Sequence, residues 1–351
     1  MLSLRQWLPK IGIWADMPFS YRSFYSRPNS LRQAIRSMDA PQSWAQVSDV
    51  FRDDFWTDEV QGIAWDGAHW IFSCNANPNK PDVNAKALYV FAGGQPLADD
   101  GWICRVNYKD VPRPSSGTHF ESDDHWGQLT WHNGFLYVAH FWAEGPGHGR
   151  TNVVVFQDNG GVLTYDRWVQ LKPVQPSEGG GWFYPEFQGI NPWDGLFYTC
   201  RGGPNPREMF LHDPQSGAWK DRRVLKFSGG ENQGINVTED GAALAVDLPS
   251  NVQGACFSPN GHIYVACDAR LPASIDYKAI ACFSALNGHL MGVIPVLAQE
   301  ENQELEGNCY GSVSWADGRV AQMHAVLLEN RDAALDNIFF KSFAADRPEV
   351  A

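Results

Sequence analysis

Apolar and polar residues alternate along short segments that turn back at Asp-Gly or Asn-Gly pairs. The first instance is the segment 59–74, which turns at Asp66-Gly67. Alternating segments joined by such a pair predict a β-hairpin. The same pattern predicts four more hairpins, at residues 127–140, 188–200, 253–267 and 311–324. Aligned on Gln61, the copies recur about every 60 residues.

A second half follows each hairpin and completes a repeated unit. Its third strand is predicted at residues 88–91, 153–156, 209–211, 280–283 and 338–340. In the middle copies a turn and a fourth strand follow, such as Trp168–Leu171. Repeated four-stranded units are typical of a β-propeller, and most of the chain resembles that superfamily. We therefore predict an all-β, single propeller with five blades.

The ends of the repeat define the expected domain organisation. The last unit has no fourth strand of its own, and we expect residues 43–51 to supply it and close the ring. The propeller then covers residues 43–345, preceded by an extension over 1–42 with a short helix at Ser30–Met38 and followed by a tail over 346–351. A further hairpin pattern at residues 231–246 is interpreted as an addition to the fourth blade. A six-bladed ring is the alternative.

Composition restricts the partners and the compartment. The formal charge is −13, with 40 acidic against 27 basic residues, which disfavours nucleic acid and an anionic membrane as partners. No run of 18 apolar residues occurs, and the first ten residues are too short and interrupted for a secretory signal. At least four of the seven cysteines lie in predicted strands of the repeat. We expect them to be reduced and the protein to be cytoplasmic.

One face of the predicted ring carries the candidate chemistry, because long polar loops follow the second strand of each hairpin there. Every copy of the hairpin has a side chain that can ligate a metal two places before the residue aligned with Gln61. These residues are Glu59, His125, Glu186, Asn251 and Cys309. Glu59, Glu186 and Asn251 favour a divalent metal, Ca²⁺ first, while His125 favours zinc, manganese or iron. The alternative is that these groups hydrogen-bond backbone and water in a wet channel.

A second set of positions lies at the end of each hairpin. It contains only cysteine and histidine: Cys74, His140, Cys200, Cys267 and His324. The thiols are expected to pack as small apolar groups. We expect the histidines, with Asn75, Arg201 and Asp268 just beyond such ends, to contact a substrate. The alternatives are packing for His140 and His324 and a surface salt bridge for Arg201.

Two local segments add candidate chemistry at the same face. Asp124 beside His125 predicts a general base with an orienting carboxylate, the alternative being a merely solvated acid. The glycine-rich segment 141–150 is a candidate lid. No Gly-x-Ser-x-Gly turn, phosphate-binding loop, Cys-x-x-Cys or His-Glu-x-x-His motif is present, so a site would be assembled from several blades.

Glu59-Val60-Gln61-Gly62 resembles the Glu-Gly-Pro opening of the gluconolactonase and senescence-marker group. In that group the glutamate binds a metal in the central channel. Gln-Gly stands here in place of Gly-Pro. The resemblance implies a metal-dependent hydrolase or lactonase acting on a small polar molecule. A non-catalytic propeller that binds a glycan or a protein is the alternative.

Overall fold

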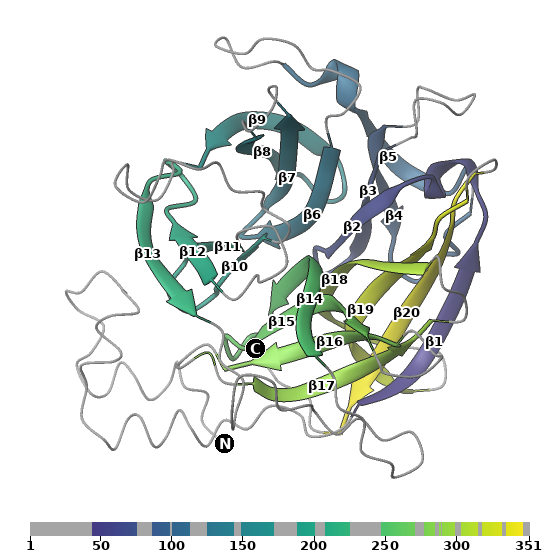
Figure 1. Cartoon of the computed structure of the whole chain (residues 1–351). Coiled ribbons are helices and arrows are strands. Elements are labelled where there is room, and N and C mark those ends of the chain that lie inside the picture. Colours follow the sequence, from purple (N-terminus) through teal and green to yellow (C-terminus); the bar gives the residue numbers. More distant parts are fainter. Residues whose placement is uncertain are drawn as a thin grey trace, which may run out of the picture.

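The computed structural model describes residues 44–75, 86–98, 100–112, 125–143, 149–171, 188–200, 208–224, 247–270, 277–284, 288, 290–298, 303–314, 318–331 and 335–346. They form five four-stranded antiparallel sheets arranged around an axis, a five-bladed β-propeller (Figure 1). The expected fold class is confirmed. The additional hairpin at 231–246 and the helix at Ser30–Met38 lie outside the described residues.

Each blade runs from an inner strand to an outer one. The strands are: blade 1, β2 (Val60–Trp65), β3 (His69–Cys74), β4 (Ala87–Ala92) and β5 (Trp102–Asn107); blade 2, β6 (His125–His132), β7 (Phe135–Ala143), β8 (Gly149–Asp158) and β9 (Leu163–Gln170); blade 3, β10 (Gln188–Ile190), β11 (Phe197–Cys200), β12 (Glu208–His212) and β13 (Trp219–Val224); blade 4, β14 (Asp247–Phe257), β15 (Ile263–Arg270), β16 (Tyr277–Phe283) and β17 (Leu290–Leu297); blade 5, β18 (Gln303–Ser314), β19 (Val320–Glu329), β20 (Asn337–Ala345) and β1 (Trp44–Arg52). Two short 3-10 helices, Phe55–Thr57 and Tyr108–Asp110, follow β1 and β5.

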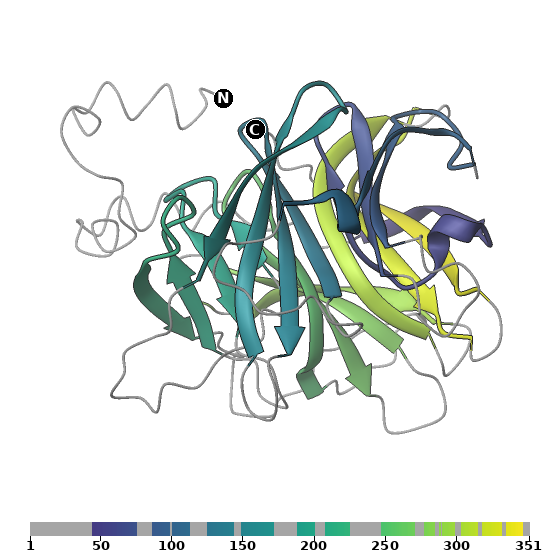
Figure 2. The same ribbon diagram turned by 90° about the horizontal axis from the view of Figure 1, so that it is seen from above.

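The Asp-Gly and Asn-Gly turns form as predicted. The second residue of each is a glycine with positive φ, from 68° at Gly195 to 105° at Gly67. That conformation is unstrained only for glycine. These turns lie on one face of the ring, together with the turns between third and fourth strands, since the Gly93 N–H after β4 donates to the Ala68 carbonyl (2.7 Å). The opposite face, where the inner strands begin, carries the connections from second to third strands and between blades (Figure 2).

Strand β1 closes the ring, as the sequence predicted. It pairs antiparallel with β20, from Trp44 opposite Ala345 to Arg52 opposite Ile338. The buried ammonium of Lys341 lies 2.7 Å from the Asp49 carboxylate across this pair. An N-terminal strand thus completes the blade that is formed by the C-terminal end of the chain.

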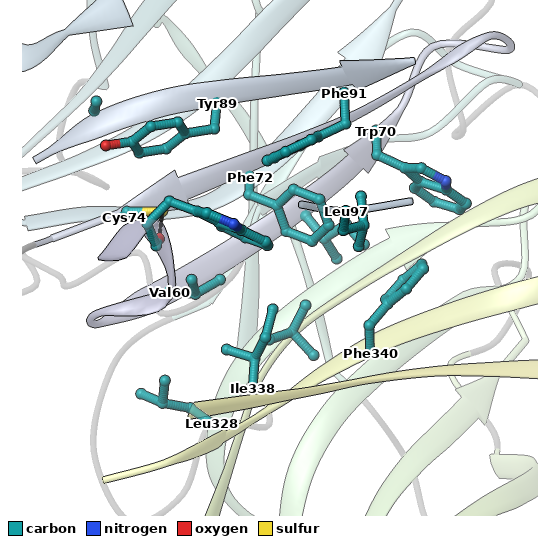
Figure 3. Packing of buried hydrophobic residues seen from close by; sticks show 14 of the residues in the cluster. Val60, Trp70, Phe72, Cys74, Tyr89, Phe91, Leu97, Leu328, Ile338 and Phe340 are labelled. Carbon is teal, nitrogen blue, oxygen red and sulfur yellow. Dashed lines mark hydrogen bonds between the residues drawn. The ribbon is translucent and has the colours of Figure 1, made fainter. Parts of the chain in front are cut away.

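The core lies between the blades. Five clusters of buried apolar side chains each combine residues of two neighbouring blades, and together they cover all five interfaces. Figure 3 shows the cluster between blades 1 and 5, where Phe72 and Phe91 face Ile338 and Phe340. Each blade therefore buries its two faces only against its neighbours in the ring.

Candidate functional site at the mouth of the central channel

The inner strands approach one another so closely at the axis that only glycine fits. A Cβ atom on Gly62 would lie 2.7 Å from the Gly127 carbonyl oxygen and 2.8 Å from the Gln128 Cα. A Cβ atom on Gly254 would lie 3.0 Å from the Gly307 Cα, and a Cβ atom on Gly307 would lie 3.0 Å from the Gly62 Cα. Real Cβ atoms essentially never approach backbone as closely as at Gly62, and contacts of 3.0 Å are tighter than nine in ten real ones, so these glycines set the spacing of the blades.

Blade 2 departs from this pattern and closes the channel. Its order is Gly127-Gln128, whereas blades 1, 3 and 4 have Gln-Gly, so a glutamine occupies the axial position. Gln128 is fully buried, and its amide donates to the carbonyl of Asn308 in blade 5 (2.6 Å) and lies 3.5 Å from that of Ala255 in blade 4. The axial residues Gly62, Gln128, Gly189, Gly254 and Gly307 are called the channel floor below.

Strand pairing identifies which residues stand at equal height above the floor. Val60 pairs with Cys74, Trp126 with His140, Val252 with Cys267 and Leu305 with Leu327. Each of these inner-strand residues lies two places before its floor residue. The position three places before the floor residue is therefore equivalent in blades 1, 2, 4 and 5, where it is occupied by Glu59, His125, Asn251 and Glu304. The same spacing in the sequence adds Glu186 for blade 3, and we call these five residues the mouth ring.

This register corrects the fifth member of the predicted ring. Cys309 lies beyond the floor residue Gly307, and Glu304 takes the place that was assigned to it. Cys309 is buried, and burial raises the pKa of its thiol far above the ordinary range. The signal was present in the sequence, since Glu304-Leu305-Glu306-Gly307 repeats the pattern of Glu59-Val60-Gln61-Gly62. The replacement adds a third carboxylate to the ring.

The structure describes the mouth ring in part. Glu59 and Glu304 are half-buried. The backbones of His125 and Asn251 belong to β6 and β14, and their side chains lie outside what is described. Asp124, Glu186 and Arg201 lie outside the described residues, as does the side chain of Asp268. Among the side chains that are described, no group of three His, Cys, Asp or Glu is arranged to hold a metal.

Asn75 forms a bridge between blades 1 and 2. Its side-chain amide donates to the Trp126 carbonyl and its oxygen accepts from the Trp126 N–H, both at 2.7 Å. Its own backbone N–H donates to the carbonyl of Glu59 (2.9 Å). Asn75, predicted to contact a substrate, therefore connects Glu59 to the neighbour of His125.

His140 and His324 both lie inside the fold and are fully buried. His140 Nε2 is 2.7 Å from the hydroxyl of Tyr108, with the two rings stacked, and Trp168 contacts it edge-on. His324 contacts the Ser342 hydroxyl and the Gly311 carbonyl at 2.8 and 2.9 Å. Burial lowers the pKa of His324 to about 4, so it is neutral near pH 7.

The described thiols of the second set are buried. Cys74 donates to the Trp56 carbonyl, and Cys267 to that of Ala279. Burial raises the pKa of Cys74 well above its ordinary value, which keeps the thiol protonated. The side chains of six cysteines are described, and all six are free; that of Cys200 lies outside what is described.

The predicted lid is shorter than the sequence suggested. Phe141, Trp142 and Ala143 continue β7 and pair with Thr151, Arg150 and Gly149 of β8. Both ends of the segment 141–150 thus extend a regular hairpin, and residues 144–148 lie outside the described part of the chain. Within the described part of the chain, no helix is long and apolar enough to span a membrane.

Comparison with known proteins identifies similar folds only. A scan of protein families finds no match, and neither does a search of curated proteins. Among solved structures, the chain is similar to glutaminyl cyclase from Myxococcus xanthus at 12% identity and a TM-score of 0.46, covering 87% of this chain and 97% of that one. It is also similar to the RS223 β-xylosidase at 13% identity and a TM-score of 0.47, covering 84% of this chain and 94% of that one. A GH43_1 enzyme from Xanthomonas citri is similar at 13% identity and a TM-score of 0.45, covering 88% of this chain and 92% of that one. At these values the similarities carry no argument about activity.

Proposed function

We propose that the protein is an enzyme with a single site at the mouth of the central channel. The observation that supports this most is the mouth ring: Glu59, His125, Asn251 and Glu304 occupy equivalent backbone positions above a floor that Gln128 closes, and the sequence spacing adds Glu186. A purely structural repeat has no need of carboxylate, imidazole and amide groups there. The closed floor gives such a site one entrance, from the loop face.

The ring suits a divalent metal. Glu59, Glu186, Glu304 and Asn251 supply oxygen ligands, the type that Ca²⁺ takes in its six- to eight-fold coordination, with His125 as a nitrogen donor that also suits manganese, zinc or iron. With three carboxylates among five positions, calcium ranks first. When bound, such an ion polarises a substrate carbonyl as a Lewis acid.

The remaining chemistry falls to the chain itself. Where the oxygen ligands hold the ion without His125, this imidazole would accept and return the proton, oriented by Asp124, in a hydrolysis or lactone-opening step. Arg201 and Asp268 would orient a small polar substrate at the rim. Lactones are included because Glu59-Val60-Gln61-Gly62 resembles the opening of gluconolactonases.

A substrate screen with matched variants tests this proposal. Purified protein is assayed against lactones and esters with and without chelator, alongside Glu59→Gln and Glu186→Gln. We expect activity to disappear with chelator and in both variants. Asp53→Asn is the control, because Asp53 is exposed and its carboxylate contacts Arg331 at 3.5 Å. Activity that survives both substitutions would refute the proposal. Glycan or protein binding that resists chelator would instead assign a binding propeller.

A further inference from the structure

Glu59 has an unusual backbone for a glutamate. Its φ is 53°, in the left-handed region, and Asn133 is the one other described non-glycine residue with positive φ. Asn133 precedes Gly134 in a tight hairpin turn that requires this conformation. Glu59 lies in the turn after the 3-10 helix Phe55–Thr57, where it follows Asp58 (φ −64°, ψ 119°) in the manner of a type II turn, a place usually taken by glycine or asparagine. A left-handed glutamate costs free energy and persists only where its surroundings enforce it.

The carboxylate of Asp336 is one group that enforces it. Asp336 is 1% exposed and precedes β20. Its Oδ2 accepts the N–H of Glu59 at 3.3 Å, and its Oδ1 accepts the N–H of Arg331 at 2.7 Å. The carbonyl of Glu59 is held from the other side by Asn75. Both peptide groups that flank the Glu59 Cα are therefore fixed.

Asp336 is itself held by the residues just before Glu59. Its backbone N–H donates to the Asp58 carboxylate at 3.3 Å, and its carbonyl accepts the Thr57 hydroxyl at 2.7 Å. These bonds join positions about 280 residues apart in the chain, across the interface of blades 5 and 1. The segment 57–59 and Asp336 thus form one reciprocal, buried clamp.

We propose that Asp336 is a positioning residue for the channel-mouth site. By holding Glu59 in the left-handed conformation, its carboxylate sets the direction in which the Glu59 side chain leaves the backbone. Through Asn75 the same clamp is connected to Trp126, the neighbour of His125. This inference rests on the proposed function in one respect only, that Glu59 is a metal ligand.

Metal affinity in a double-mutant cycle tests the role. Ca²⁺ binding is measured by titration calorimetry for the wild type, Asp336→Asn, Glu59→Gln and the double variant. Removing such an outer contact typically weakens metal binding by 10- to 100-fold, so we expect at least about a tenfold loss in Asp336→Asn. We expect no further loss when Glu59→Gln is already present. Equal factors in both backgrounds would mean a general structural role and would overturn the proposal. Asp53→Asn is again the control and should bind like the wild type.

A second measurement decides the positioning without any metal. Glu59→Gly and Glu59→Ala are compared by equilibrium unfolding. Glycine adopts the left-handed conformation freely and alanine does not, so the unfolding constant of the alanine variant should be roughly tenfold larger. In the Asp336→Asn background, if that variant folds, the difference should shrink. Equal stabilities of the two variants in the wild-type background would refute the clamp. If the wild type binds no divalent metal, the proposed function fails and this comparison still stands.

Discussion

The channel floor predicts a sharp contrast between two glycines that adjoin at the axis. A Cβ on Gly62 would meet only backbone atoms, the Gly127 carbonyl oxygen at 2.7 Å, the Gln128 Cα at 2.8 Å and the Leu129 nitrogen at 3.0 Å. A Cβ on Gly127 would meet the Ala139 Cβ at 3.5 Å, an ordinary contact. Neither glycine has a positive φ. The two alanine substitutions therefore differ mainly in steric overlap.

The magnitude follows from that overlap. Inserting a methyl group into a packed site costs about 1–3 kcal/mol, and backbone neighbours place Gly62→Ala at the upper end. Loss of chain entropy in the unfolded state returns about 0.4–1 kcal/mol to either variant. We expect Gly62→Ala to lose about 2 kcal/mol and Gly127→Ala to be unchanged or slightly stabilised.

Urea unfolding followed by tryptophan fluorescence measures the contrast, since the chain has 15 tryptophans. The midpoint of Gly62→Ala should fall while the slope with urea stays constant, which separates a stability change from a change in compactness. Equal midpoints for the two variants would show that the blades do not meet this closely. The register of the mouth ring would then lose its basis.

Three further predictions concern the ring closure and the blade interfaces. Asn75→Ala removes two buried hydrogen bonds and should cost about 2–4 kcal/mol in urea unfolding. An unchanged midpoint for this variant would contradict the bridge. His324 has a folded pKa of about 4 against an ordinary 6.5. Its stabilising contribution should be fully present above pH 6.5 and be lost as the pH falls to 4, by up to about 3 kcal/mol, and His324→Gln should flatten this pH dependence of unfolding; an equal slope in both proteins would refute it. Asp49→Ala leaves the buried Lys341 ammonium without its carboxylate and should destabilise the protein by roughly 3 kcal/mol. Adding Lys341→Met to this variant removes the unpaired charge and should restore part of that loss. No recovery in thermal unfolding would count against the ion pair.

The blade architecture could be predicted because its determinants are local. Asp-Gly and Asn-Gly turns, alternating apolar residues and the missing fourth strand at the C-terminal end are all visible in the sequence. The structure confirms five blades and the closing role of β1. The turns and the alternation depend on neighbours within a few residues, whereas the closing role of β1 followed from the missing strand in the last repeat.

The register of blade 5 could not be found by aligning the turns. Asp66 follows its floor glycine by four residues in blade 1, whereas Asp317 follows Gly307 by ten in blade 5. The β18–β19 pairing has two register shifts within this longer strand, between Leu305 and Gly307 and between Tyr310 and Val313. Alignment on the turn therefore selected Cys309, while alignment on the axial glycine selects Glu304. The axis, where backbones nearly touch, is the more constrained reference point.

Long-range partners were also beyond the sequence. Nothing near Asn75 indicates that its amide would bind the Trp126 peptide, and nothing near Asp336 indicates that it would hold Glu59. Such pairs are brought together only by closure of the ring. Cys and His at the hairpin ends were visible as a pattern, but their burial depends on packing between blades.

Metal content tests the central claim most directly. Protein purified without chelators or a histidine tag is analysed by plasma emission, alongside thermal unfolding with and without chelator, for the wild type and the Glu59→Gln, Glu186→Gln double variant. We predict about one equivalent of a divalent metal in the wild type, a melting temperature that chelator lowers, and neither property in the double variant. A wild type without metal and with an unmoved melting temperature, or a double variant that keeps its metal, would contradict the assignment of the mouth ring.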